Sequence, residues 1–258
     1  MIRLEFALRR KPGMSRTEFQ QYWREVHGPL VASHSTHLGI QRYVQLHTLD
    51  DPINDALAEA RGGMEEPYDG VAELWWENLE ALEAGATEAG RAAGAELLAD
   101  EKNFIDLPRS PLWMAYEYPQ VNPSEEMVAR EHSPLIKLFF CLRQLPGRKL
   151  DDTQLYWRTN HGPLIRGVST AMRMRRYLQV HYTAHPLEEA LRAARGTETE
   201  PYYGHAEAWF RRSDLFDMER WPEAARAMEL AVEDEAKFID FKRSAMWVGK
   251  EKVFIDRR

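Results

Sequence analysis

The chain has 258 residues, 44% of them hydrophobic and 29% charged, which is ordinary for a soluble globular protein. Its formal net charge of −7, with both signs well represented, argues against nucleic acid or a membrane surface as a partner. The single cysteine, Cys141, excludes an intrachain disulfide and fits a reducing compartment. No apolar run approaches the roughly 18 residues needed to span a bilayer, and the N-terminal residues alternate like a strand rather than a signal peptide. We therefore expect a cytoplasmic protein.

The sequence contains one unit written twice. The segment YWREVHGPL at 22–30 recurs as YWRTNHGPL at 156–164, and the offset of 134 residues holds along the chain without a gap. A repeat of this length predicts two copies of one domain, each large enough for its own core. We place the first domain at 1–118, a linker rich in proline and acidic residues at 119–134, and the second domain at 135–258.

In chain order, the first unit begins with a strand over 2–8, where apolar and polar residues alternate. Ser15 and Glu18 form a capping box that starts a helix, which we expect to end at His27 because Gly28 and Pro29 follow it. A short helical piece comes after Pro29. The remaining elements are a strand over 43–47, a helix over 52–61, a strand over 70–76, a long helix over 78–102 and a strand over 111–117. The second unit repeats this plan, with its long helix over about 213–237.

This order of strands and helices predicts an α+β fold of two ferredoxin-like repeats, each an antiparallel sheet with helices on one face. The second face of each sheet then needs cover, and the other repeat is attached at high effective concentration. We expect the two sheets to form an intrachain α/β barrel, a pseudo-dimer within one chain. Further association into homodimers is left open.

The His-Gly-Pro-Leu helix, the strand pattern Tyr-x-Gly-x-Ala-Glu-x-Trp and the segment Phe-Ile-Asp-x2-Arg-Ser together resemble the EthD family of the dimeric α/β-barrel superfamily. The resemblance covers nearly the whole chain, twice. It implies the barrel fold, and it places the chain among cofactor-free cyclases, monooxygenases, haem-degrading proteins and lyases that act on aromatic molecules. EthD itself is an accessory to ether breakdown. The cyclases of the superfamily use a histidine near the matching helix end.

Of nine histidines, two positions occur in both copies: His27 with His161, and His47 with His181. A histidine in the last turn of a helix can simply stabilise the helix end. It can also act as a general acid or base near neutral pH when it faces a pocket. The resemblance favours the second interpretation, so His27 and His161 are the candidate catalytic residues.

A second group of repeated residues has polar or aromatic side chains at alternating strand positions, which places them on one face of each sheet. We expect this group to line the inside of the barrel, where a Glu–His pair would be either an acid–base couple or a structural network that fixes sheet packing. Tyr22, Trp23 and their copies on the helices would complete a substrate pocket. The strand residues are Tyr43, Gln45, His47, Glu73 and Trp75, repeated as Tyr177, Gln179, His181, Glu207 and Trp209, and the helix copies are Tyr156 and Trp157.

Other candidates are weaker. His34 and His37 have the spacing of a metal pair but no second copy, so we expect a surface helix there and no metal site. Asp106 and Arg109 recur as Asp240 and Arg243 and suit a salt bridge or turn, or contact with an anionic substrate. Cys141 has no partner in the other copy, and no segment has the spacing of a phosphate-binding loop.

Two positions break the repeat. Glu5 corresponds to Phe139, and Val71 corresponds to His205. The two copies are therefore not equivalent where they meet, so a single asymmetric site is possible as well as two active ones.

These observations favour a cofactor-independent enzyme with proton-transfer chemistry, such as cyclisation, dehydration or another lyase step, on a small aromatic or polyketide-like molecule. A monooxygenase reaction would require the substrate itself to reduce oxygen. The alternative is a non-catalytic protein that binds a hydrophobic small molecule as an accessory to an oxygenase pathway, and haem binding is a third reading. Whether the site is the barrel interior or the space between helices and sheet stays open.

Overall fold

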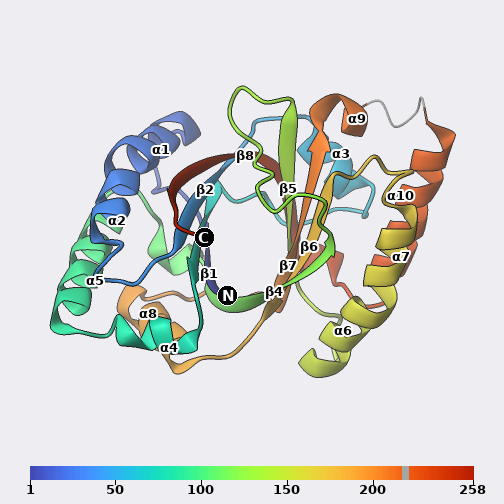
Figure 1. Cartoon of the computed structure of the whole chain (residues 1–258). Coiled ribbons are helices and arrows are strands. Elements are labelled where there is room, and N and C mark those ends of the chain that lie inside the picture. The colour runs from blue at the N-terminus through green and yellow to red at the C-terminus, as the bar shows by residue number, and fades with distance from the viewer. Residues whose placement is uncertain (217–220) are drawn as a thin grey trace.

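The computed structural model describes residues 1–216 and 221–258. Within them, eight antiparallel strands close into a barrel in the order β1-β3-β2-β8-β5-β7-β6-β4, surrounded by helices (Figure 1). The predicted α+β barrel within one chain is therefore confirmed. The strands are β1 (Ile2–Leu8), β2 (Arg42–Thr48), β3 (Gly70–Trp76), β4 (Leu112–Val121), β5 (Leu135–Leu142), β6 (Arg176–Tyr182), β7 (Gly204–Arg211) and β8 (Ala245–Asp256).

The last strand of each half joins the two halves. The first part of β4 pairs with β1 of its own half, and the part after Met114 pairs with β6 of the second half. In the same way β8 pairs first with β5 and then, from Gly249 onward, with β2 of the first half. These two long strands satisfy the hydrogen bonds of both sheet edges, so the barrel has no open edge. The segment from Tyr118 to Val121, which the sequence suggested was mostly linker, is part of β4.

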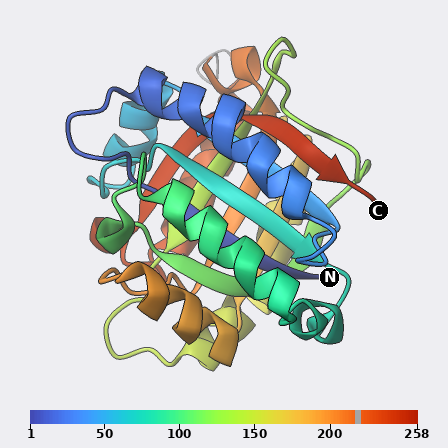
Figure 2. The same ribbon diagram turned by 90° about the vertical axis from the view of Figure 1, so that its left-hand side faces the viewer.

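Helices cover the outside of the barrel on two opposite sides (Figures 1 and 2). Two helices cross to the other half: α3 packs against β8, and α8 packs against β4. Figure 1 shows α3 beside the helices of the second half and α8 beside those of the first. The helices are α1 (Arg16–Tyr22), α2 (Gly28–His34), α3 (Ile53–Glu59), α4 (Leu79–Ala84), α5 (Glu88–Glu101), α6 (Leu150–Tyr156), α7 (Gly162–Val168), α8 (Pro186–Arg195), α9 (Arg212–Phe216) and α10 (Pro222–Glu235).

The sequence predicted that the first helix ends at His27, but the helical segment continues past this residue. A π-helical turn, η1 (Trp23–His27), connects α1 to α2, and η3 (Trp157–His161) does the same between α6 and α7. The backbone N–H of Gly28 donates to the carbonyl of Trp23, five residues back, and Pro29 at the start of α2 has no N–H to place. The wider turn thus lets the chain pass Gly-Pro without leaving the helix. His27 and His161 are consequently in the middle of a helical segment rather than at its end.

The single long helix expected over 78–102 is two helices, α4 and α5. Asn78 caps the first, accepting from the N–H of Ala81, and Thr87 caps the second, accepting from the N–H of Gly90. In the second half, α9 ends at Phe216 and α10 begins at Pro222. The part of the predicted helix at 217–220 lies outside the described residues.

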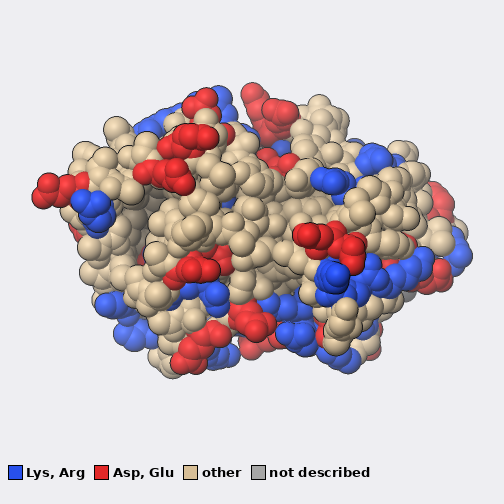
Figure 3. Space-filling model, turned by 90° about the horizontal axis from the view of Figure 1, so that it is seen from below, with Lys and Arg blue, Asp and Glu red and all other residues tan. Residues whose placement is uncertain are grey.

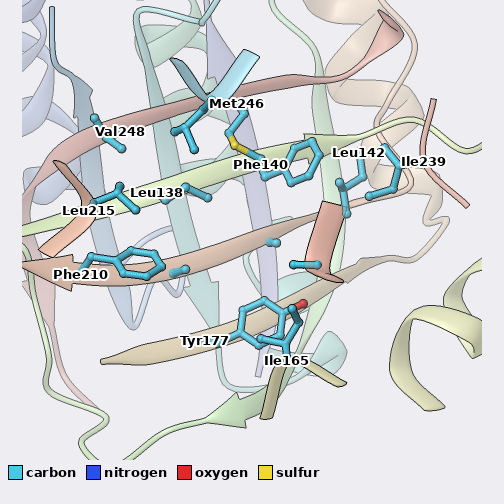
Figure 4. Close-up of a cluster of buried hydrophobic side chains, with 14 of the residues drawn as sticks. Leu138, Phe140, Leu142, Ile165, Tyr177, Phe210, Leu215, Ile239, Met246 and Val248 are labelled. Atoms are coloured by element: carbon cyan, nitrogen blue, oxygen red, sulfur yellow. The ribbon is translucent and has the colours of Figure 1, made fainter. Parts of the chain in front are cut away.

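Each half has an apolar core between its helices and the outer face of the barrel. Figure 4 shows this core in the second half, where Leu138, Phe140 and Phe210 point from the strands toward the helices. No helix of the described residues has the length and apolar character to cross a membrane. Acidic and basic side chains lie interspersed over the face shown in Figure 3.

Candidate functional site

A histidine, an aspartate and a tyrosine form the same hydrogen-bonded group in each half. In the second half, His161 Nδ1 lies 2.8 Å from Asp234 Oδ2, and the Tyr156 hydroxyl donates to Asp234 Oδ1 at 2.7 Å. In the first half, the corresponding distances are 2.8 Å for His27 to Asp100 and 2.6 Å for Tyr22 to Asp100. The side chains come from the first helical segment and the long helix beside it. Both imidazoles are buried, with exposed fractions of 6% and 4% for His27 and His161.

The aspartate determines how the imidazole can react. The hydrogen bond from His161, together with those from Lys237 and Tyr156, holds the pKa of Asp234 well below its usual value. The carboxylate is therefore ionised and accepts the proton on Nδ1, so Nε2 is the ring nitrogen left for another partner. Burial, and the hydrogen bond to Asp234, raise the pKa of Tyr156, so its hydroxyl stays protonated as a donor. The arrangement orients the imidazole. The sequence reading did not single out Asp100 or Asp234, although they recur at the repeat offset.

The polar residues of β2 and β6 face the helices and not the barrel interior, contrary to the prediction. Gln179 Nε2 donates to the carbonyl of Trp157 at 2.8 Å, and the His181 ring stacks on the Trp157 ring with centroids 4.4 Å apart. The first half repeats this arrangement with Gln45, His47 and Trp23, where the donor distance is 2.9 Å and the centroids are 4.7 Å apart. The same correction applies to Tyr43 and Tyr177, which hydrogen-bond Gln45 and Gln179 on that outer face.

These residues hold the π-helical turns in place. The carbonyl of Trp157 accepts both from the N–H of Gly162 and from Gln179. Burial lowers the pKa of His181 to about 3, and that of His47 likewise, so both rings are neutral stacking partners. Gly70 and Gly204 leave room for the rings of Trp23 and Trp157, since a Cβ on Gly70 would lie 2.4 Å from the Trp23 ring.

Glu73, Trp75, Glu207 and Trp209 do point into the barrel, as predicted. Because Glu73 and His47 are on opposite faces of the sheet wall, the expected Glu–His pair between them does not form. Lys137 Nζ contacts Glu73 at 2.7 Å and Glu207 at 3.1 Å instead. The interior is a buried ionic network, and burial raises the pKa of Glu73 to about 7. Further members that the sequence did not reveal are Arg3, Glu117 and Glu251, which contact this network at 2.6 to 3.6 Å.

A cavity lies in the second half, between the outer face of the barrel and the helices. The cavity is small, with a volume of about 50 Å³. Most of its wall is apolar, and His161, Trp157 and Tyr177 line it. Arg61, which follows α3 of the first half, closes one side through a buried ion pair with Glu235 at 2.8 Å.

Side-chain size distinguishes the two halves at this place. Ala208 and Ala231 line the cavity, whereas the repeat offset puts Leu74 and Leu97 at the corresponding positions of the first half. Both leucines belong to the packed core of the first half. Phe254 also enters that core and stacks on Tyr43, with centroids 5.5 Å apart, where the second half has Gln120. The same His-Asp-Tyr group therefore borders open space in the second half and packed side chains in the first.

The weaker candidates are structural. His34 pairs with Glu96 at 2.9 Å on the surface, and Asp106 and Arg109 form a salt bridge at 3.7 Å. Arg243, the copy of Arg109, contacts Glu200 at 3.8 Å, and Asp240 precedes a 3-10 turn. Cys141 is fully buried, and burial raises the pKa of its thiol well above the usual value. A thiol in this state is a poor nucleophile.

Comparisons with known proteins gave one family and several solved structures. The chain is similar to the crystal structure of an anthrone oxidase-like protein, with a TM-score of 0.60 and 12% identity over 100% of this chain and 94% of that chain. It is also similar to a dye-decolorizing peroxidase from Bacteroides thetaiotaomicron VPI-5482, with a TM-score of 0.45 and 6% identity over 96% and 92% of the two chains. No curated protein sequence matches it. The model of the EthD domain matches twice, at residues 11–108 and 145–242, and the chain therefore belongs to the EthD family.

Proposed function

We propose that the chain is a cofactor-independent enzyme that transfers a proton on a small aromatic or polyketide-like molecule, with the reaction at His161 in the second half. One observation carries the proposal: an imidazole oriented by a buried aspartate borders an apolar cavity. A convergent polar group in an otherwise apolar pocket is the usual form of a small-molecule site. Proton transfer by a positioned histidine contributes about 10² to 10⁴-fold to a rate.

In this proposal, His161 Nε2 removes a proton from a carbon or hydroxyl next to a carbonyl and returns it at another position. Asp234 is a positioning residue that stabilises the imidazolium formed in between, in the manner of the buried aspartate of a catalytic triad. Trp157 and Tyr177 provide flat walls for an aromatic ring. Ala208 and Ala231 provide the free space beside these walls, and neighbouring side chains must move to admit a ring because the cavity is small.

The first half has a different role in the proposal. His27, Asp100 and Tyr22 keep the same hydrogen bonds, but the neighbouring space is packed with leucine side chains. We propose that this half is structural and that it supplies α3 and Arg61 as one wall of the active half. We also propose that each half of the barrel is a ferredoxin-like repeat.

The test is exchange of carbon-bound hydrogen in D₂O with 2-tetralone as the probe, followed by proton NMR. This bicyclic ketone has a weakly acidic methylene between its ring and its carbonyl, so its exchange reports proton transfer whatever the natural reaction is. The wild type should accelerate exchange, and His161→Gln should lose that acceleration by about 10²-fold or more. His27→Gln is the matched control and should retain it. Equal loss in both variants, or none in either, contradicts the assignment to the second half.

A binding protein accessory to an oxygenase pathway is the second candidate, favoured by the small size and apolar wall of the cavity. Quenching of tryptophan fluorescence by 2-tetralone measures binding directly, because Trp157 lines the site. An enzyme should retain binding in His161→Gln while losing exchange. A carrier should bind the probe in both proteins without accelerating exchange in either.

A further inference from the structure

Three metal-ligating side chains meet inside the barrel, away from the helix–sheet cavity. His205 Nε2 lies 3.0 Å from Glu207 Oε1 and 3.8 Å from Glu5 Oε2. One ligand atom from each residue can be chosen so that all lie within 4.8 Å of one another, and all three side chains are buried. An ion about 2.0 to 2.2 Å from each of three donors separates those donors by about 3 to 4 Å. The two distances from His205 Nε2 fall within this range, and the shorter one is also a hydrogen bond.

Some of the buried polar atoms at this place lack hydrogen-bond partners, although His205 Nε2 and Glu207 Oε1 bond each other and Arg3 donates to Glu207. Neither carboxylate oxygen of Glu5 accepts a hydrogen bond, and His205 Nδ1 has no partner either. Arg3 Nε lies 2.7 Å from Glu5 Oε1, but without hydrogen-bond geometry, and Glu5 Oε2 faces His205. A buried carboxylate oxygen without a donor is destabilising, so a further partner such as a cation would stabilise Glu5.

The repeat supplies an independent observation. Glu5 and His205 are two positions at which the halves differ, since their copies are Phe139 and Val71. Although 200 residues apart in the sequence, these two departures meet at one point of the barrel. The pseudo-equivalent point has a phenylalanine and a valine there and no ligand set. The difference between the halves is therefore concerted, and it creates one site per chain.

The surroundings are rich in carboxylates. Five of them, those of Glu5, Glu73, Glu117, Glu207 and Glu251, share the network with Arg3 and Lys137. Arg42 and Arg176 lie over the Trp75 and Trp209 rings beside this network. Arg3 donates to Glu207 at 2.6 Å and Lys137 lies 3.1 Å from its other oxygen, which are the outer contacts that orient a carboxylate ligand.

We propose that Glu5, His205 and Glu207 bind one divalent transition-metal ion, of the chemistry of Zn²⁺, as a structural centre. The ligands come from both halves, β1 on one side and β7 on the other, so the ion fastens the halves across the barrel. Because the site is enclosed, the ion enters as the chain folds, and its binding free energy adds to that of folding. Its function is separate from the proton transfer proposed at His161.

The experiment refolds the full chain from denaturant with either Zn²⁺ or EDTA, removes free metal, and measures bound metal and Tm. The wild type should retain about one Zn²⁺ per chain and melt at least about 5 °C higher than the EDTA sample. The control is the double variant Glu5→Phe and His205→Val, which installs the pair that the chain already uses at the pseudo-equivalent point. It should fold, retain no zinc and melt alike in both solutions.

Two results overturn the site: wild type that retains less than a tenth of an ion per chain, or a double variant that retains as much zinc as the wild type. The metal content of the wild type decides the question even if the double variant fails to fold. In the first case the cluster is neutralised by protons alone, and Tm should not respond to zinc.

Discussion

The two halves share a hydrogen-bonded group but differ in the space around it. His27 and His161 have the same aspartate and tyrosine partners at nearly the same distances. Only His161 borders the described cavity, because alanines replace the leucines that fill the first half. A repeated constellation thus reflects the architecture that both halves need, and the departure from the repeat is where we propose the site.

The largest expected effect concerns the contacts that cross between halves. Arg61 pairs with Glu235 of the second half, and Arg195 pairs with Glu101 of the first at 2.7 Å, with the side chains largely buried. Removing one partner leaves a buried charge, so Arg61→Ala and Arg195→Ala should each lower the free energy of unfolding by about 3 to 5 kcal/mol. Urea denaturation measures this loss.

The same pair of variants separates the halves in function. Only Arg61 lines the cavity, so Arg61→Ala should also weaken 2-tetralone binding, whereas Arg195→Ala should bind as the wild type does at a temperature where both are folded. Weaker binding in Arg195→Ala would place the ligand in the first half, which contradicts the proposed site.

The next effect tests the packing difference directly. Leu97→Ala creates a cavity in the first half and should cost about 2 to 5 kcal/mol of stability. Ala231→Leu fills the second-half cavity and should abolish probe binding at a smaller cost of about 1 to 3 kcal/mol. Calorimetric melting and fluorescence titration give the two numbers. If Ala231→Leu binds normally, the cavity is not the binding site.

A smaller effect, equal in the two halves, is expected from the glutamines that hold the π-helical turns. Gln45→Ala and Gln179→Ala each leave a carbonyl of a buried turn with one donor fewer, at a cost of about 1 to 2 kcal/mol. Urea denaturation of the two variants should give similar losses. A difference of more than about 1 kcal/mol would show that the glutamine supports the π-helical turn more in one half than in the other.

The sequence predicted the fold well because the repeat and the strand alternation are local signals. Ile136, Leu138 and Phe140 alternate with Lys137, Phe139 and Cys141, and each set does occupy one face of β5. The sequence did not predict that the ends of β4 and β8 join the two halves, because the polar residues and Pro119 at the end of β4 resemble a linker. Only pairing with β6 shows that this segment is a strand.

The site was harder to predict because alternation does not tell which face is inside. The polar side chains of Tyr43, Gln45 and His47 led us to predict that they line a polar barrel interior. The interior is polar, but other residues form it. The face with Gln45 contacts a helix carbonyl, and the face with Val44 lies in the barrel. Asp100 and Asp234 could have been found, since they recur at the repeat offset one helical turn before a repeated Phe-Ile-Asp segment.

The smallest effect is a pH dependence that distinguishes the two aspartates. Hydrogen bonds from His161, Lys237 and Tyr156 depress the pKa of Asp234 below its unfolded value, which is about 3.9. A depressed carboxyl pKa gives stability that is complete above about pH 5 and is lost as the pH falls below the unfolded value. Asp234→Asn removes the titrating group, so its free energy of unfolding should fall less between about pH 5 and pH 3 than that of the wild type, by about 1 kcal/mol.

Asp100→Asn is the comparison variant for this measurement. The first half has Asn103 at the position of Lys237, so Asp100 has an amide neighbour at 3.5 Å where Asp234 has an ammonium group at 2.9 Å. Asp100→Asn removes the same contacts with histidine and tyrosine but none with an ammonium group, so the difference between the two variants reports the contact with Lys237. Urea midpoints at a series of pH values supply both curves. Curves that coincide would mean that Lys237, which is mostly exposed, contributes nothing measurable, and that the two histidine–aspartate pairs differ only in the space they face.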